Sequence, residues 1–318
     1  MISIKAIENA SQNIIDVVRK TPMITSRTLS SMNDNQLFLK GEHLQPIGAF
    51  KIRGATNKVK AAAEAGAKHV VTASSGNHGQ AVAYIAAKLG LQVTIVVPEN
   101  AVSSKVAAIR GYGAAIISYG TTSTERLQKA GELTDDEETV FIPPYDDPLV
   151  MAGQGTAGLE ILDQIPDVDA IVVPVGGGGL MSGIATAVKE TRPDVQVIGV
   201  EPERANDTYL SKQQGAITAI DHADTIADGL RASQPGDLTF PVVQKYADDI
   251  VLVSEKDIRQ ALLLVLERTK QLIEPSAATA VAAVLSNKTG LHGKNVCCVL
   301  SGGNIALDQL SEFIGQAR

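Results

Sequence analysis

Apolar and polar positions follow two different periods along this chain. Residues 4–19 place apolar side chains at helical spacing, and Pro22 follows just beyond them. Short runs of apolar and β-branched residues recur further on, separated by stretches with helical spacing. These strand-like runs cover residues 37–40, 69–73, 93–98, 114–119, 139–143, 170–175, 195–200, 249–253 and 295–300. Strands that alternate with helices are typical of parallel sheets covered by helices, so the sequence predicts an α/β fold.

The predicted strands fall into two groups along the chain. Three runs between residues 69 and 119, with a fourth at 139–143, form a compact group with intervening helices. The turn-like segment 143–148 follows, and the pattern resumes with a helix expected near residues 155–165. The remaining strands belong to a second, larger group. The chain is therefore expected to form two lobes, each an open, mostly parallel sheet flanked by helices.

Composition argues against several classes of protein. Mean hydropathy is +0.08, and no apolar run reaches the roughly 18 residues of a membrane span, so we expect a soluble protein without a membrane partner. The net charge of −7 and the lack of tryptophan argue against nucleic acid as a partner. The N-terminus lacks the layout of a secretory signal, which favours a cytoplasmic location.

Only two cysteines occur in the 318 residues, and they are neighbours, Cys297 and Cys298. They lie in the predicted strand 295–300, where successive side chains point to opposite faces of a sheet. A disulfide between them or a metal site is therefore not expected. We interpret both as buried packing residues in a reducing compartment.

The most informative loop is a run of four glycines between a predicted strand and a predicted helix. Residues 176–179 follow the apolar run 170–175 and lead into the helical segment 181–190. Successive glycines let backbone N–H groups converge on one point, and the helix N-terminus adds a positive partial charge. The spacing matches neither the dinucleotide-binding nor the Walker pattern. The loop is predicted to bind a phosphate, with a flexible turn as the plainer alternative.

A lysine stands at the start of another predicted helix. Lys51 lies in the segment 48–54, where burial and the helix dipole would lower the pKa of its amine. A neutral amine attacks aldehydes, so such a lysine suits covalent catalysis. Taken alone, it is more simply a solvated surface charge.

Two further loops are expected near the same edge. Segment 72–80 is a strand-to-helix turn whose hydroxyl groups and exposed N–H groups suit a substrate carboxylate, and its His78 is a candidate general base. Alternatively, Ser74 and Ser75 simply cap the following helix. Segment 300–304 ends the last predicted strand at the edge where α/β proteins bind ligands.

Together, and in this order, these motifs resemble the serine racemase and serine/threonine dehydratase (threonine ammonia-lyase) family. Its members are pyridoxal-phosphate enzymes of the tryptophan-synthase-β fold type. The similarity runs from about residue 21 to residue 303. It implies a large cofactor-binding domain of residues 1–68 and 147–318 and a small, mobile domain of residues 69–146 on the substrate side. The family generally forms dimers, so a homodimer is implied.

The resemblance also implies roles for individual residues. Lys51 would hold the cofactor as a Schiff base and, with Ser75, act as a catalytic residue. The implied cofactor-binding residues are Phe50, Lys51, Asn77, Gly176, Gly177, Gly178, Gly179, Leu180 and Ser301. The implied substrate-binding residues are Ser74, Ser75, Asn77 and His78. Glu274 is expected near the cofactor.

The implied reaction is dehydration of L-serine or L-threonine to a 2-oxo acid and ammonia, with serine racemisation as a second activity. A serine at position 301 would leave the cofactor ring a weaker electron sink than a carboxylate would, and both reactions fit such a ring. The segment around Ser75 resembles that of the racemases, whereas the segment around Tyr145 resembles that of the catabolic threonine dehydratases. The alternatives are a dedicated serine racemase or a 3-hydroxyaspartate dehydratase. A β-replacing synthase and a non-catalytic cofactor-binding protein are more remote alternatives.

A metal site is suggested by the acidic segment 201–207. Glu201 and Asp207, with a main-chain carbonyl, supply hard oxygen ligands for Mg²⁺ or Ca²⁺. The resemblance names Glu201, the Ala205 carbonyl and Asp207 as ligands of a structural Mg²⁺, Ca²⁺ or Mn²⁺. Without the resemblance, an ordinary acidic loop is the simpler interpretation.

The resemblance also leads to expectations about regulation by small molecules. Gln80 and Asn304 match the nucleotide effector site of the animal racemases, whereas Arg27 and Ile47 depart from it, which argues against activation by ATP. The chain ends at Arg318 without the regulatory domain of biosynthetic threonine dehydratases, so feedback by isoleucine is not expected.

Overall fold

The computed structural model of the protein describes residues 1–101 and 103–317. The strands are β1 (Met23–Thr25), β2 (Gln36–Lys40), β3 (His69–Ala73), β4 (Gln92–Val97), β5 (Ala115–Ser118), β6 (Thr139–Phe141), β7 (Ala170–Pro174), β8 (Gln196–Pro202), β9 (Asp249–Val253) and β10 (Asn295–Val299). The α-helices are α1 (Ile4–Ile14), α2 (Arg27–Ser31), α3 (Lys51–Glu64), α4 (Asn77–Leu89), α5 (Ser103–Gly111), α6 (Ser123–Glu132), α7 (Pro148–Gln164), α8 (Gly179–Lys189), α9 (Asp207–Gln214), α10 (Thr239–Tyr246), α11 (Glu255–Thr269), α12 (Pro275–Leu285) and α13 (Leu307–Gly315). Two short 3₁₀-helices are η1 (Glu42–Leu44) and η2 (Asp228–Leu230).

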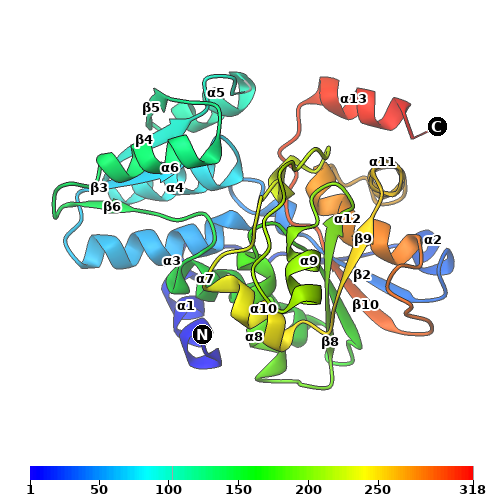
Figure 1. The fold of residues 1–318 in the computed structure, drawn as a ribbon. Coiled ribbons are helices and arrows are strands. Elements are labelled where there is room, and N and C mark those ends of the chain that lie inside the picture. Colours follow the sequence, from blue (N-terminus) through cyan, green and yellow to red (C-terminus); the bar gives the residue numbers. More distant parts are fainter. Residues whose placement is uncertain (102, 318) are drawn as a thin grey trace.

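The strands form two separate sheets, which lie in different parts of the molecule (Figure 1). The larger sheet has the order β1-β2-β10-β7-β8-β9, and all its neighbours are parallel except the antiparallel pair β1 and β2. The smaller sheet has the order β5-β4-β3-β6 and is entirely parallel. The predicted α/β class, with two mostly parallel sheets, is confirmed. The exact limits of the two domains stay a prediction.

Helices cover both faces of the larger sheet, and β10 shows how its residues alternate between them. Cys298 packs with Val281 of α12 in the core on one face. Cys297 packs with Ile161 of α7 and Ile184 of α8 in the core on the other face. Both cysteines are buried and form no disulfide, which confirms the interpretation of this pair as packing residues.

The smaller sheet is covered in the same way. Ile52 of α3 and Ile85 of α4 pack against it in one apolar cluster. Ala130 of α6 packs against Val71 and Val96 on its other side. Helix α3 thus begins beside the larger sheet and buries its apolar face against the smaller one, so it connects the two parts of the molecule (Figure 1).

Three features differ from the sequence-based expectations. Helix α1 ends at Ile14 and not at Arg19, because the apolar spacing continues in a turn whose Val17 packs against the core beside the smaller sheet. Helix α7 begins at Pro148, seven residues earlier than expected, because Asp147 caps it and proline is tolerated in a first helical turn. The short strand β1 was not predicted.

None of the helices among residues 1–101 and 103–317 is long and apolar enough to cross a membrane.

Candidate functional site

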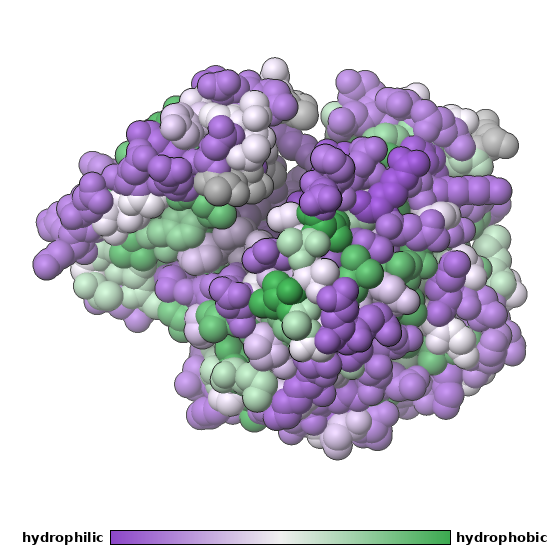
Figure 2. All heavy atoms as spheres, viewed as in Figure 1, coloured by the Kyte–Doolittle hydropathy of each residue, from purple (hydrophilic) through white to green (hydrophobic). Residues whose placement is uncertain are grey.

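A cavity of about 530 Å³ lies between the two sheets, at the carboxyl ends of their strands. The recess between the two parts of the molecule is visible in Figure 2. The cavity brings together every residue that the sequence assigned to the cofactor or the substrate. These lining residues are Phe50, Lys51, Ser74, Ser75, Asn77, His78, Gly176, Gly177, Gly178, Gly179, Leu180 and Ser301. Glu274, expected nearby, lines it as well.

Lys51 is the first residue of α3, and its side chain enters the cavity. Its Nζ donates a hydrogen bond of 2.6 Å to the carbonyl oxygen of Pro144 and lies 5.2 Å from the centre of the Phe50 ring. Burial lowers the pKa of Lys51 to about 8, although the negative charge of Glu274 opposes that shift. Near neutral pH the side chain therefore has an appreciable neutral fraction that can act as a nucleophile.

The glycine run has the geometry of an anion site. Gly178 is the N-cap of α8 with a left-handed φ of 88°, and no side chain caps the helix. The first amide groups of α8 are thus without a side-chain partner at the cavity wall. A Cβ atom on Gly177 would lie 2.4 Å from the Tyr145 ring, and one on Gly178 would lie 2.8 Å from Thr239 Oγ1. Glycine is required at both positions because the neighbouring side chains leave no room.

The turn after β3 presents a second set of uncapped amides. The N-cap of α4 is Gly76, and no side chain caps this helix, so the alternative in which Ser74 and Ser75 cap it is wrong. Ser74 Oγ instead accepts a hydrogen bond from the Gly76 amide at 3.3 Å. Ser75 is half-buried at the cavity wall, where its hydroxyl remains available to a bound molecule.

His78 is held as a neutral side chain. The ring is buried, and Nε2 donates a hydrogen bond of 2.9 Å to the carbonyl oxygen of Ile142. Burial, with a smaller contribution from the charge of Lys51, lowers the pKa of His78 to about 3. A group with this pKa is a weak base, so the structure disfavours His78 as a general base.

A chain of polar side chains connects Asn304, Asn77 and Glu274. The Asn304 amide donates to Asn77 Oδ1 at 2.8 Å, and Asn77 Nδ2 donates to the two carboxylate oxygens of Glu274 at 2.9 and 3.2 Å. Burial raises the pKa of Glu274 to about 7, and Asp228 adds to this shift. Asn77 therefore has a fixed orientation at the cavity, beside an acid that titrates near neutral pH.

Sequence reasoning missed several charged residues in the cavity wall. Lys105 of α5 and Arg126 of α6 approach from the smaller sheet, and Asp228 and Arg231 approach from the larger part. Lys105 forms an ion pair with Asp228 across the cavity. In the sequence these residues resemble ordinary surface charges, and only the fold shows that they face a common space.

The metal-binding candidates lie outside this cavity, near the end of β8. Glu201 and Asp207 are fully buried; Glu201 accepts hydrogen bonds from the amides of Thr208 and Tyr209, whereas neither carboxylate oxygen of Asp207 has a hydrogen-bond partner. Burial raises the pKa of Asp207 to about 7, and burial and the charge of Asp207 raise that of Glu201. Unpartnered buried carboxylate oxygens fit a bound cation.

A cation at this place would need more than side chains. Across residues 1–101 and 103–317, no cluster of three or more His, Cys, Asp or Glu side chains is arranged to hold a metal ion. The two carboxylates would be joined by the carbonyl of the buried Ala205, with water completing the shell. This ligand set suits Mg²⁺, Ca²⁺ or Mn²⁺ and not a softer metal.

Comparison with known proteins places this geometry in a family. The family model described as pyridoxal-phosphate dependent enzyme matches residues 14–302. The chain is 42% identical to L-threonine ammonia-lyase from Thermotoga maritima over 99% of its own length and 79% of that protein. It is 44% identical to serine racemase from Homo sapiens, over 99% of this chain and 95% of that one.

A solved structure agrees with these sequence matches. Serine racemase from Dictyostelium discoideum superimposes with a TM-score of 0.90 at 41% identity, covering 96% of this chain and 99% of that one. The cavity with its glycine loop and half-buried lysine has the chemistry that such a cofactor needs. The protein therefore belongs to the pyridoxal-phosphate dependent enzymes, in the group that contains the threonine ammonia-lyases and the serine racemases.

Proposed function

We propose that the protein is an L-serine/L-threonine dehydratase that also racemises serine. The observation that carries the proposal is that Lys51 and Ser75, two groups able to exchange a proton with a substrate, line the same cavity as the glycine loop. Relatives named L-threonine ammonia-lyase and serine racemase support both halves of the proposal at similar identity.

The cofactor supplies one element of the chemistry. When bound, pyridoxal phosphate withdraws electrons from the α-carbon of an attached amino acid and so acidifies it. The amides of residues 176–179 and the N-terminus of α8 would bind the phosphate. Asn77 and Ser301 would hold the polar atoms of the ring, and Phe50 would lie beside it. The hydrogen bonds from Asn304 and to Glu274 support this role because they fix the Asn77 amide.

Lys51 and Ser75 then divide the proton transfers. Lys51 removes the α-proton, for which its lowered pKa supports the role of base. Loss of the β-hydroxyl followed by hydrolysis gives a 2-oxo acid and ammonia. When the hydroxyl stays, Ser75 delivers a proton from the opposite side and the configuration inverts. Ser74 and the amides at the start of α4 would bind the substrate carboxylate.

The metal has a structural role in this proposal. Glu201, Asp207 and the Ala205 carbonyl would bind Mg²⁺ or a similar cation, which would relieve the repulsion between two buried carboxylates. It would fix the connection from β8 to α9, and no catalytic step requires it.

A 3-hydroxyaspartate dehydratase is the second candidate, and the cavity wall supports it. Arg126 contributes a guanidinium group to the cavity, and Arg231 adds a second one, whereas the charge of Lys105 is paired with Asp228. A guanidinium group suits recognition of a second carboxylate. A dicarboxylic substrate would therefore find guanidinium groups that serine and threonine do not require.

One experiment distinguishes these activities. The purified enzyme is incubated with Mg²⁺ and, separately, with L-serine, L-threonine and L-threo-3-hydroxyaspartate, while 2-oxo acid, ammonia and D-amino acid are measured. The proposal expects 2-oxo acid from serine and threonine, with D-serine forming alongside. Turnover of 3-hydroxyaspartate alone would favour the second candidate, and no product from any of the three would refute both.

A further inference from the structure

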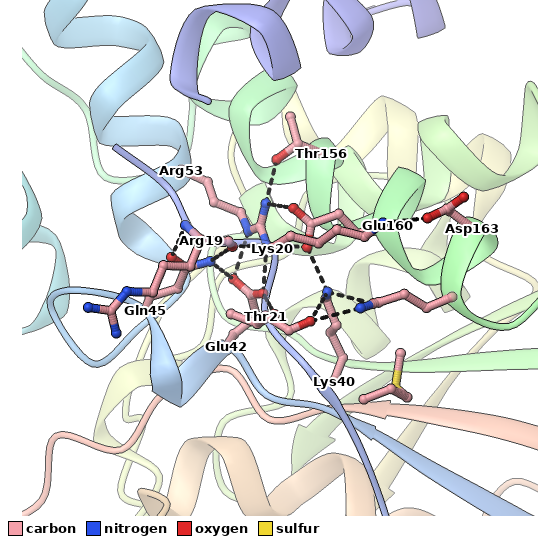
Figure 3. A network of polar contacts seen from close by, with 12 residues as sticks. Arg19, Lys20, Thr21, Lys40, Glu42, Gln45, Arg53, Thr156, Glu160 and Asp163 are labelled. Atoms are coloured by element: carbon pink, nitrogen blue, oxygen red, sulfur yellow. Dashed lines mark hydrogen bonds and ion pairs between the residues drawn. The ribbon is translucent and has the colours of Figure 1, made fainter. Parts of the chain in front are cut away.

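A network of buried and partly buried charges surrounds Arg53, close to Lys51 in the sequence (Figure 3). Its central residue is Arg53, two positions after Lys51 in α3, with a side chain that is fully buried. Arg53 Nε and Nη2 donate to the two carboxylate oxygens of Glu42 at 2.7 and 2.8 Å. Arg53 Nη1 and Nη2 also donate to the two oxygens of Glu160 at 2.8 Å each. One guanidinium group is thus bidentate to two carboxylates from different elements.

Further contacts extend the network into the larger sheet. Lys40, the last residue of β2, is fully buried and donates from Nζ to Glu160 at 2.6 Å and to the Thr21 carbonyl at 2.9 Å. The Thr21 hydroxyl donates to Glu42 at 2.6 Å. The two positive charges of Arg53 and Lys40 balance the two negative charges of the glutamates, and each group has hydrogen-bond partners. Because Lys40 pairs with Val299 of β10, the network lies next to the strand that leads into Ser301.

Few side chains other than Arg53 hold the start of α3; one is Gln154, whose Oε1 accepts a hydrogen bond from the Gly54 amide at 3.2 Å. Its N-cap is Phe50, and no side chain caps the helix. The Phe50 amide is held by the carbonyl oxygen of Ser301 at 3.0 Å. Arg53 lies in the first turn, so its bonds to Glu42 and Glu160 fix that turn against η1 and α7. Arg53 is therefore one of the contacts that fix the turn from which the Lys51 side chain departs.

The contacts of Arg53 also reach the helix that follows the hydrogen-bond partner of Lys51. Glu160 belongs to α7, and the segment that enters this helix contains Pro144, whose carbonyl accepts from Lys51 Nζ. Helices α3 and α7 also approach closely, since a Cβ atom on Gly153 would lie 2.6 Å from Gly54 Cα. Arg53 thus links the helix that carries Lys51 to the helix that follows Pro144.

Stability alone is a weak reason for such a network. Well-packed apolar side chains of similar volume often serve a fold as well as a buried ion pair does, because burying charges costs hydration energy. What four paired charges add is a single geometry, since any displacement breaks several charge-assisted hydrogen bonds together.

We propose that Arg53, held by Glu42 and Glu160, is a positioning residue that sets the place of the Lys51 amine in the cavity. This inference rests on the proposed role of Lys51. It also goes beyond that role, because it requires that an enzyme with an altered Arg53 is catalytically impaired even when it is folded and loaded with cofactor.

The test uses Arg53→Lys, which keeps the positive charge and loses the fork of donors. For L-serine dehydration by the holoenzyme, kcat is expected to fall by about 10- to 100-fold, because misplacement by about 1 Å costs up to about 10² in rate. KM should change by less than about threefold. As a readout independent of turnover, the apoprotein should regain the absorbance band of lysine-bound cofactor several-fold more slowly than wild type on addition of pyridoxal phosphate.

A second variant covers the case in which Arg53→Lys does not fold. Glu160→Gln changes a side chain that is 18% exposed and removes one charge while keeping the shape, and it should reduce kcat and slow recovery of the band in the same direction. The control is Asp163→Asn. Asp163 lies on the same helix as Glu160, and its substitution breaks only an exposed ion pair with Lys20, so this variant should match wild type in both measurements.

The outcomes separate the two claims. Wild-type kcat and wild-type recovery of the band in the folded Arg53 and Glu160 variants, with only a lower melting temperature, would overturn the positioning role. A Lys51→Ala variant that keeps both the band and turnover would instead refute the proposed function.

Discussion

Burial shifts the pKa values of Lys51, His78 and Glu274 toward the neutral form of each group. Near pH 7 to 8 the cavity thus contains a lysine that is partly neutral, a histidine that is fully neutral and a glutamate that is partly protonated. Because the lysine and the histidine lose positive charge, the cavity presents less fixed charge than its sequence suggests. Burial and the charge of Glu274 together set the pKa of Lys51, and so the pH above which its amine can act as a nucleophile.

Cofactor capture by the apoprotein should therefore depend on pH. Only the neutral amine attacks an aldehyde, so the rate of band formation should rise about tenfold per pH unit below about 8 and level off above it. Glu274→Gln should move this inflection to lower pH, because the carboxylate charge favours the ammonium form of Lys51. Stopped-flow mixing of apoprotein with pyridoxal phosphate across pH 6 to 10 measures both. An unchanged inflection in the variant would contradict the coupling.

Ser75→Ala tests the division of the proton transfers. Racemisation of serine should fall by about 10² or more, since a positioned acid or base contributes about 10² to 10⁴. Dehydration of L-serine should stay within about fivefold of wild type, because Lys51 alone removes the α-proton. Chiral chromatography and a 2-oxo acid assay on the same reaction give both rates. Equal loss of the two activities would refute a separate role for Ser75. Ser74→Ala serves as the comparison, since its hydroxyl is proposed to bind substrate in both reactions.

Among the elements, the glycine loop has the strictest steric requirement. Gly177→Ala would place a methyl group 2.4 Å from the Tyr145 ring, so the loop or the ring must move. Affinity for pyridoxal phosphate should fall by at least about tenfold, because the amides that converge on the phosphate are displaced. Gly315→Ala is the matched control, since a Cβ atom there meets no atom within 4 Å. Titration of the apoproteins, followed by the cofactor band, measures the two affinities, and equal affinities would count against the phosphate site.

Elements at strand ends were the most predictable part of the site. The glycine run and the loops at Lys51, Ser75 and Ser301 could be found because each follows a strand or opens a helix, and parallel strands end at one sheet edge. The Arg53 network could not, because a lone arginine in a helix normally faces solvent. Its partners Glu42 and Glu160 lie 11 and 107 residues away along the chain, and no local pattern pairs them.

The ends of helices and strands were likewise predictable only where a local pattern marks them. The run of prolines and aspartates in segment 143–148 indicates a turn and so hides the start of α7, although Asp147 and a first-turn proline together signal a helix start. The strand β1 consists of three residues whose pairing with β2 is a tertiary contact. Charged residues of the cavity wall, such as Lys105 and Arg126, were missed because only the packing of the two parts turns them toward a common space.

At the scale of the whole molecule, the two buried carboxylates near β8 are a source of instability that a cation would remove. Burial raises the pKa of Asp207 from its ordinary value of 3.8 to about 7, so without a cation the protein loses stability as pH rises between these two values. Mg²⁺ or Ca²⁺ should therefore raise the melting temperature by several degrees at pH 8, and by less at pH 6.

Thermal unfolding of the protein with and without each cation measures this effect. Glu201→Gln should abolish the response to cations, whereas Glu203→Gln, an exposed neighbour in the same segment, should retain it. An identical response in both variants would place any cation elsewhere.

The two parts of the molecule meet at the cavity, so the account depends most on which lysine holds the cofactor there. The most direct measurement is to reduce the holoenzyme with borohydride, digest it and identify the modified peptide by mass spectrometry. The account predicts that the pyridoxyl group is attached to Lys51, with little on any other lysine. Stoichiometric attachment to a different lysine, such as Lys105, which also lines the cavity, would contradict this expectation.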